Sequence, residues 1–145
     1  MEGYQVVFEH EVLFRDLDAM GHVNNVAFVS VMEDARMQYW KSLRTVHGLK
    51  DINFILGEVT CRYLNPAYLG ETLLIGIRAR NLGNKSFHFE YRMEDKASGR
   101  LITEGRSVQV MYDYKEQKSR PLNNRMRDAV TALEKLKLSD LSAAE

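Results

Sequence analysis

Cysteine, proline and long apolar runs are scarce in this sequence of 145 residues. Cys61 is the single cysteine, so no disulfide can form within the chain and no multi-cysteine metal cluster can be built. There is no run of roughly eighteen apolar residues, so we predict no membrane-spanning helix. The first residues lack a basic segment followed by an apolar one, and we expect no secretory leader. The plain expectation is a cytoplasmic protein.

The chain also lacks an excess of charge of either sign. Lysine plus arginine and aspartate plus glutamate both number 20, so the formal net charge is zero. This balance argues against a nucleic-acid-binding protein, which usually carries a clear basic excess. It is compatible with self-association. We expect a single domain over residues 1–138 and a flexible tail over residues 139–145.

Alternation of apolar and polar residues predicts strands within residues 4–14, 52–65, 72–80, 86–94 and 101–114. The pattern is clearest in residues 86–94, whose apolar side chains should all face one side of the sheet: Phe87, Phe89, Tyr91 and Met93. Short turns join successive strands, which favours an antiparallel sheet.

A helical period separates the first two predicted strands. Apolar residues recur there at steps of three and four: Phe28, Met32, Ala35, Tyr39 and Leu43. Its first half is apolar on almost every other side too, through Val26, Ala27, Val29 and Val31, so we expect this helix to be wrapped by other structure. A second helix is predicted over residues 122–136. The sequence thus predicts an α+β fold, with an antiparallel sheet of about five strands around one long central helix and a C-terminal helix.

The polar run FRDLDAMGHVNN, residues 14–25, interrupts the apolar pattern just before the central helix. Asp18 and His22 are spaced as metal ligands on a helix could be, but no second cluster of ligand residues follows, and His10, His47 and His88 are scattered. We therefore predict no metal site. Helix capping by Asn24 or Asn25 is a second interpretation. Capping needs only one residue and leaves most of the run unexplained.

Catalysis is the third interpretation. The first N–H groups of a helix lack partners within it and lie at the positive end of its dipole, so they can hold a substrate carbonyl oxygen. A carboxylate one loop earlier can attack that carbonyl or activate water. Gly21 allows the backbone to approach a ligand closely. Asp16 and Asp18 both precede the helix, and either could satisfy backbone donors of the turn.

The run D-x-D-x-x-G-H-V-N-N over Asp16–Asn25, followed by E-x-A-R over Glu33–Arg36, resembles the hotdog-fold acyl-CoA thioesterases of the 4-hydroxybenzoyl-CoA thioesterase group. CRYLNPAYLGETLLI and EGRSVQVMYDYKEQKSRPL are similar to later segments of that family. The resemblance therefore extends from about Tyr4 to Leu122. It implies a hotdog fold, homodimers or homotetramers, and an active site between subunits.

By position in the family motif, the resemblance implies that Asp18 is the nucleophile or general base and that the backbone N–H of Asn25 polarises the thioester carbonyl. His22 and Asn24 would organise the loop and pocket wall, together with Gly21 and Val23. Asp16 would order the turn rather than take part in the chemistry. Some related enzymes use a helical glutamate as base, which makes Glu33 an alternative. An ion pair of Glu33 with Arg36, three residues on, is the favoured role for that residue.

The remaining expectations concern the substrate. Coenzyme A phosphates need cationic partners, and the turn at residues 83–86 offers Lys85, with Ser86 as a hydrogen-bonding neighbour. The substrate would be an acyl-CoA or an acyl carrier protein thioester, with no metal or organic cofactor. Cys61 is expected to be an inert core thiol. A hotdog hydratase or dehydratase, a non-catalytic acyl-CoA sensor and a structural subunit with a decayed site stay open as alternatives.

Overall fold

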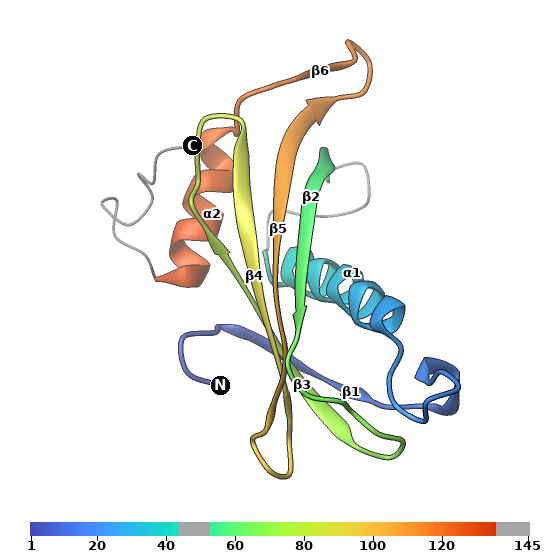
Figure 1. Cartoon of the computed structure of the whole chain (residues 1–145). Coiled ribbons are helices and arrows are strands. Elements are labelled where there is room, and N and C mark those ends of the chain that lie inside the picture. Colours follow the sequence, from blue (N-terminus) through green and yellow to red (C-terminus); the bar gives the residue numbers. More distant parts are fainter. Residues whose placement is uncertain (44–52, 136–145) are drawn as a thin grey trace.

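The computed structural model describes residues 1–43 and 53–135. Six strands form an antiparallel sheet in the order β1-β3-β4-β5-β2, with the short β6 pairing β5 (Figure 1). The strands are β1 (Val6–Glu11), β2 (Phe54–Tyr63), β3 (Thr72–Arg80), β4 (Ser86–Asp95), β5 (Leu101–Asp113) and β6 (Lys118–Ser119). The helices are the 3₁₀ helix η1 (Phe14–Asp16), α1 (Asn25–Ser42) and α2 (Asn124–Glu134). The predicted α+β class and antiparallel sheet are confirmed, while the tail predicted over residues 139–145 lies outside the described residues.

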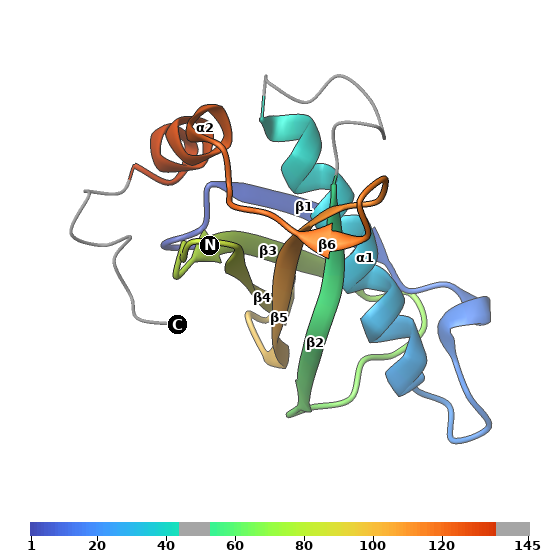
Figure 2. The ribbon, with the colours of Figure 1, turned by 90° about the horizontal axis from the view of Figure 1, so that it is seen from above.

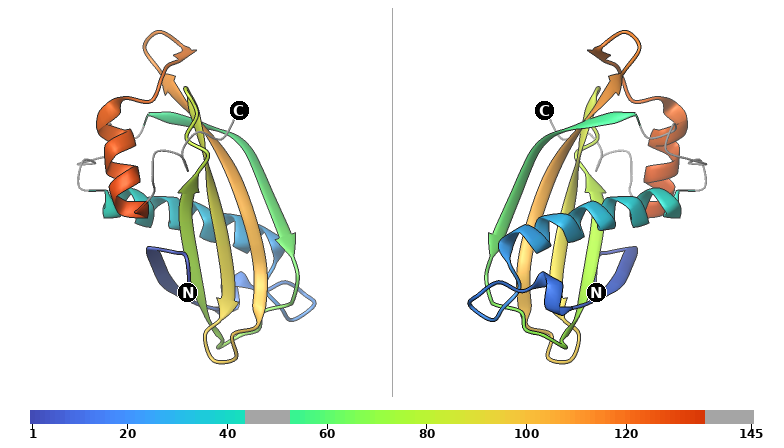
Figure 3. Two further views of the ribbon diagram at one scale, coloured as in Figure 1. Left: turned by 90° about the vertical axis from the view of Figure 1, so that its left-hand side faces the viewer. Right: turned by 90° about the vertical axis from the view of Figure 1, so that its right-hand side faces the viewer.

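The sheet is strongly curved, and α1 lies across its concave side (Figures 2 and 3). Strands β1 and β2 form the two edges of the main sheet. Helix α2 sits near the end of α1, where the Tyr39 hydroxyl donates a hydrogen bond to Glu134 at 2.8 Å. Of the helices in the described ranges, none is long and apolar enough to cross a membrane.

The face of α1 that meets the sheet is built from the predicted apolar stripe. Phe28, Met32, Ala35 and Tyr39 are all buried. The opposite flank differs from expectation, because Val26 is 63% exposed and Val29 is 39% exposed. The sheet of a single chain covers only part of a helix this apolar. The prediction that α1 is wrapped on all sides is therefore wrong for one isolated chain.

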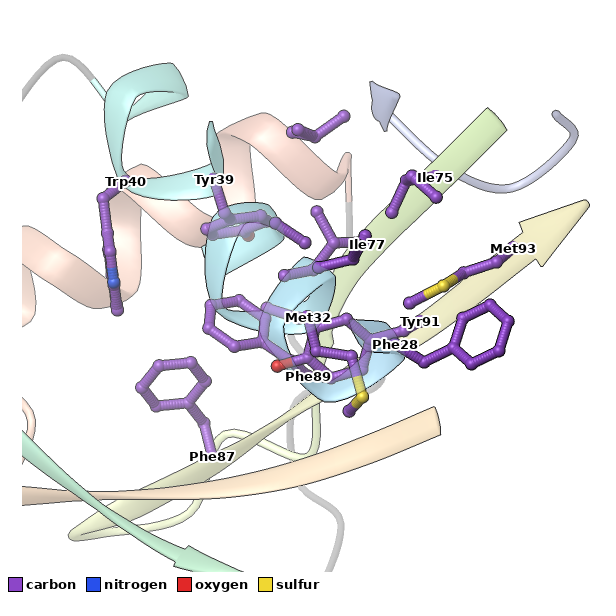
Figure 4. Close-up of a cluster of buried hydrophobic side chains, with 14 of the residues drawn as sticks. Phe28, Met32, Tyr39, Trp40, Ile75, Ile77, Phe87, Phe89, Tyr91 and Met93 are labelled. Carbon is purple, nitrogen blue, oxygen red and sulfur yellow. The ribbon is translucent and has the colours of Figure 1, made fainter. Parts of the chain in front are cut away.

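Strand β4 supplies much of the core, and its predicted alternation is confirmed. Phe87, Phe89, Tyr91 and Met93 are buried and face α1, as the close-up in Figure 4 shows. The Trp40 ring packs edge-on against Phe87 and Phe89, with ring centroids 6.0 and 5.7 Å apart. Such edge-to-face pairs add to the stabilisation from apolar burial. This aromatic cluster fixes α1 on the sheet, and with it the position of the helix N-terminus.

The first strand is shorter than predicted. β1 ends at Glu11, and Phe14 lies in η1 with 82% of its surface exposed rather than on the apolar side of the strand. The chain turns here because the Asp16 carboxylate accepts the Leu13 N–H at 3.0 Å. A local polar contact thus overrides the alternation that predicted a strand up to residue 14.

Candidate active site

The polar run folds into a tight loop that closes on itself before α1. Leu17 and Val23 form an isolated antiparallel bridge. Within it, the Asp18 N–H donates to the His22 carbonyl and the Gly21 N–H donates to the Asp18 carbonyl, each at 3.1 Å. Gly21 has a φ of +83°, in the left-handed region that favours glycine. Glycine therefore suits the conformation of this loop, while the predicted close approach of its backbone to a ligand stays a prediction.

The Asp18 side chain takes part in this loop. Its Oδ1 atom accepts the Met20 N–H at 2.8 Å, the local turn typical of aspartate. Oδ2 of Asp18 has no hydrogen bond to the protein in the described residues. One carboxylate oxygen is thus fixed by the loop, and the other is available to a substrate or a water molecule.

Asp16 has the structural role expected of it. Its Oδ2 atom accepts hydrogen bonds from His10 Nε2 at 2.9 Å and from the Leu13 N–H at 3.0 Å. Partial burial would raise the pKa of Asp16, but these hydrogen bonds and the charge of His10 outweigh that effect and lower the pKa below its ordinary value. The ionised carboxylate therefore ties the loop to β1.

This lowered pKa predicts a pH-dependent contribution to stability. A carboxyl group whose pKa is lowered by folding stabilises the folded state above its ordinary pKa of 3.8, and that contribution disappears as the pH falls through the lowered folded value. We expect Asp16→Asn to lower the free energy of unfolding by about 1 kcal/mol at neutral pH and by less in acid. Urea denaturation at several pH values measures this. Asp34→Asn, which alters an exposed carboxylate of α1, is the control and should show no such trend.

A pocket of about 410 Å³ opens between the loop, the start of α1 and the end of β2. The residues that line it are Asp18, His22, Val23, Asn25, Phe28, Tyr63, Leu64, Asn65 and Pro66. The Val23 N–H donates to the Ala67 carbonyl at 2.8 Å, which holds the loop against the segment that follows β2. The structure therefore brings Asp18 and Asn25 to one cavity.

The start of α1 faces this pocket with an unused donor. The Asn24 side chain caps the helix by accepting the Val26 N–H at 2.9 Å. In the part of the chain that the structure describes, the Asn25 N–H has no protein acceptor. The Tyr63 hydroxyl donates to the Asn25 carbonyl at 3.3 Å, which fixes this turn against β2. The N-terminus of the helix, at the positive end of its dipole, thus lies at the cavity that Asp18 lines.

Not every predicted site residue reaches this pocket. Asn24 acts as the helix cap, whereas His22 and Val23 lie in the pocket wall. Lys85 lies at the other end of the sheet, where its carbonyl accepts the Met111 N–H. On β5, the pocket residue Tyr63 pairs with Thr103, whereas Lys85 contacts Met111 near the other end of the strand. Lys85 and the pocket are therefore about 25 Å apart along β5. Within one chain, Lys85 and its neighbour Ser86 are therefore separate from the pocket.

The expected ion pair between Glu33 and Arg36 is also absent from the ion pairs of residues 1–43 and 53–135. Glu33 is exposed on α1 and does not line the pocket. Arg36 is buried, with 9% of its surface exposed, and donates to the Tyr91 hydroxyl. The prediction was wrong because residues three apart on a helix pair readily only where both side chains stay in solvent.

Several pocket residues were not predicted as part of the site. They form the segment Tyr63–Pro66, which comes from a distant part of the sequence and lies beside Phe28 of the apolar stripe of α1. The Phe28 and Tyr63 rings pack with their centroids 5.8 Å apart. The available signal was the Asn65-Pro66 pair that ends the second predicted strand, because side chains at such strand ends often line sites.

Two further side-chain expectations concern sulfur and metal chemistry. Burial raises the pKa of the Cys61 thiol, which keeps it protonated, as expected of an inert cysteine. In the described residues, no group of three or more His, Cys, Asp or Glu side chains is arranged to hold a metal ion.

Residues 12–130 match the family model of the thioesterase-like superfamily. Among characterised proteins, the chain is 25% identical over 124 residues to the long-chain acyl-CoA thioesterase FadM of Escherichia coli (strain K12), a match that spans 82% of this chain and 92% of FadM.

Two solved structures are also similar to this chain. A thioesterase from Thermus thermophilus, in complex with coenzyme A and Zn, superposes with a TM-score of 0.86 and 33% identity, covering 95% of this chain and 100% of that one. A 1,4-dihydroxy-2-naphthoyl-CoA thioesterase from Synechocystis superposes with a TM-score of 0.78 and 22% identity, over 89% and 97% of the two chains, and shares the fold.

Proposed function

Because the chain belongs to the thioesterase-like superfamily and has its hotdog fold, we propose that it is a thioesterase that hydrolyses acyl-CoA. The observation that carries this proposal is that Asp18 and Asn25 line one pocket, and that the Asn25 N–H has no acceptor among the described residues. The first is a carboxylate suited to general-base or nucleophilic catalysis, and the second is a donor suited to an oxyanion.

The proposed reaction begins with the thioester carbonyl oxygen accepting the Asn25 N–H. This hydrogen bond and the helix dipole stabilise the negative charge that develops on the oxygen when the carbonyl carbon is attacked. Asp18 either removes a proton from the attacking water or attacks the carbon itself, in which case water cleaves the resulting anhydride. The carbon–sulfur bond breaks when the tetrahedral intermediate collapses in the first route and when the anhydride forms in the second. The thiolate that leaves takes up the proton that Asp18 receives from the water, and the carboxylic acid is released. Water is the only co-substrate, so the proposal requires no cofactor.

The names of the relatives support coenzyme A as the thiol carrier. FadM is named as an acyl-CoA thioesterase, and the Thermus structure contains coenzyme A. By extension we propose coenzyme A, rather than an acyl carrier protein, for this chain.

We also propose that the active form is a homodimer or a tetramer built from such dimers. β2 is an edge strand of the main sheet, and it exposes apolar side chains, with Ile55 at 39% and Leu56 at 43%. Unpaired edge strands with apolar side chains favour pairing with another chain. If two copies join antiparallel along β2, the Lys85 end of one sheet lies beside the pocket end of the other. This arrangement gives Lys85 and Ser86 a route to the coenzyme A of the neighbouring pocket.

A thiol-release assay tests the proposed function. The purified chain is incubated with aromatic, short branched and long-chain acyl-CoAs, and free thiol is measured with a chromogenic disulfide. We expect release from at least one of these classes at rates well above the uncatalysed reaction. Tight acyl-CoA binding without release would instead support a sensor. A parallel incubation with an enoyl-CoA tests the hydratase alternative, which loss of its absorbance without free thiol would support.

A further inference from the structure

Arg36 is a buried cation without a counter-charge in the described residues. Only 9% of its surface is exposed, and its Nη1 atom donates to the Tyr91 hydroxyl at 3.1 Å. No carboxylate oxygen of residues 1–43 and 53–135 lies within ion-pair distance of the guanidinium. A buried charge is costly unless it is paired, so this arrangement indicates a position where an anion binds.

The groups around Arg36 are polar but neutral. The Tyr91 hydroxyl and the Ser107 hydroxyl lie 2.6 Å apart, and Ser107 in turn hydrogen bonds to Gln109. Burial raises the pKa of Tyr91, which keeps its hydroxyl protonated. Gln109 donates through Nε2 to the Phe87 carbonyl at 3.3 Å. These buried side chains hydrogen bond to one another, and none of them supplies the negative charge that Arg36 lacks within residues 1–43 and 53–135.

The position of Arg36 relates it to the proposed active site. It follows Asn25 by eleven residues, which places the two on nearly the same flank of α1 and about 16 Å apart along the helix axis. Asn25 contacts Tyr63 at one end of this flank, and Trp40 packs on Phe54 at the other end, with ring centroids 5.5 Å apart. Both contacts are to β2. Side chains of a helix tilt toward its N-terminus, so the Arg36 side chain leans back toward the pocket.

Apolar side chains occupy the interval between the pocket and Arg36. On α1 it contains Val29, which is 39% exposed. On β2, Val59 and Cys61 pair with Ser107 and Gly105, and both are half-buried against the core. The Phe28 and Tyr63 rings stand at the pocket end of this strip. The strip thus runs along α1 and β2 from the pocket to the helix turn that carries Arg36, and the fully buried Met32 lies beside it.

We propose that Arg36 binds a carboxylate at the far end of the acyl chain, so that the preferred substrates are coenzyme A monothioesters of medium-length dicarboxylic acids. This inference rests on the proposed thioesterase function. The terminal carboxylate supplies the missing charge, and the methylene groups lie along the apolar strip. An unsubstituted fatty acyl chain of the same length would place a methyl group against the guanidinium and leave the charge unpaired.

The wild-type enzyme provides the first test. We compare kcat/KM for suberoyl-CoA and sebacoyl-CoA with kcat/KM for octanoyl-CoA and decanoyl-CoA. A charge-assisted hydrogen bond to a buried group predicts a preference of about ten- to a hundred-fold for the dicarboxylic substrates. Efficient hydrolysis of the fatty acyl-CoAs with no such preference overturns this inference and leaves the proposed function standing. If no acyl-CoA is hydrolysed, the proposed function fails, and this inference fails with it.

The variant Arg36→Met tests the residue itself, because methionine keeps much of the apolar stem and removes the charge. We expect it to abolish the preference for sebacoyl-CoA over decanoyl-CoA. The matched control is Arg106→Met, which removes an exposed arginine from β5 next to Ser107 and should keep the preference. Sedimentation equilibrium is measured for each protein. An unchanged preference in Arg36→Met contradicts the inference. If that variant also loses its assembly, the guanidinium pairs with a second copy of the chain, which likewise overturns the inference.

Discussion

Replacement of Asp18 by asparagine is expected to lower kcat by about a thousand-fold, the scale on which a positioned acid–base group contributes to catalysis. Asparagine retains the side-chain oxygen that accepts the Met20 N–H at 2.8 Å, so the loop should keep its shape. The change therefore removes the negative charge and the nucleophilic oxygen without removing the turn. Steady-state thiol release with the best substrate of the panel measures the effect, and circular dichroism with a thermal melt checks the fold.

Asp16→Asn is the matched comparison for this experiment. It makes the same chemical change two residues earlier, in a carboxylate bound to His10 and to the Leu13 N–H. We expect it to lower stability modestly and to retain most of the turnover. Full activity in Asp18→Asn, or an equal loss of turnover in both variants, would show that Asp18 has no special role in the chemistry.

The sequence could distinguish Asp16 from Asp18 only through the family resemblance, because both carboxylates precede the same helix. Asp18 and Asn25 could be predicted together because they belong to one short run, and the fold of that run is decided locally by turns and a helix cap. Periodicity predicted β3 and β4 closely, since their alternation matches burial on one face of a sheet. It extended β1 too far, because apolar residues alternate up to Phe14 while the Asp16 contact ends the strand.

The rest of the pocket depends on contacts between distant parts of the chain. Tyr63 reaches Asn25 only because β2 lies at the edge beside β5 and runs toward the helix N-terminus. No local pattern fixes that strand order. Lys85 could likewise not be placed from sequence. A basic residue in a turn can be recognised, but the end of the sheet at which that turn lies depends on the order and direction of the strands. Arg36 was expected to pair with Glu33, and the sequence could not show that it is buried, because burial of a charge follows from packing.

Helix α2 leads to the second large effect, which concerns stability. Its Glu134 side chain is 1% exposed and accepts hydrogen bonds from the Tyr39 hydroxyl at 2.8 Å and from the Ala79 N–H at 2.7 Å. The other carboxylate oxygen lies 3.6 Å from Arg80 Nη1, an ion-pair distance beyond a hydrogen bond. One carboxylate thus joins α2 to α1 and to β3. Burial of the Tyr39 hydroxyl and the charge of this carboxylate raise the pKa of Tyr39.

Glu134→Ala is expected to lower the free energy of unfolding by about 3 kcal/mol, because it leaves two buried donors without acceptors and removes the partner of Arg80. For a chain of this length the melting temperature should fall by roughly 10 °C. Differential scanning calorimetry measures this, with Asp128→Ala, an exposed carboxylate of the same helix, as a control that should melt like the wild type. Equal stability of the two variants would mean that apolar contacts of Met126 and Val130 alone hold α2.

The two large effects should be separable. The pocket lies at the far end of α1, so Glu134→Ala should retain its turnover at temperatures below its unfolding transition. Asp18→Asn should instead lose turnover and keep its melting temperature.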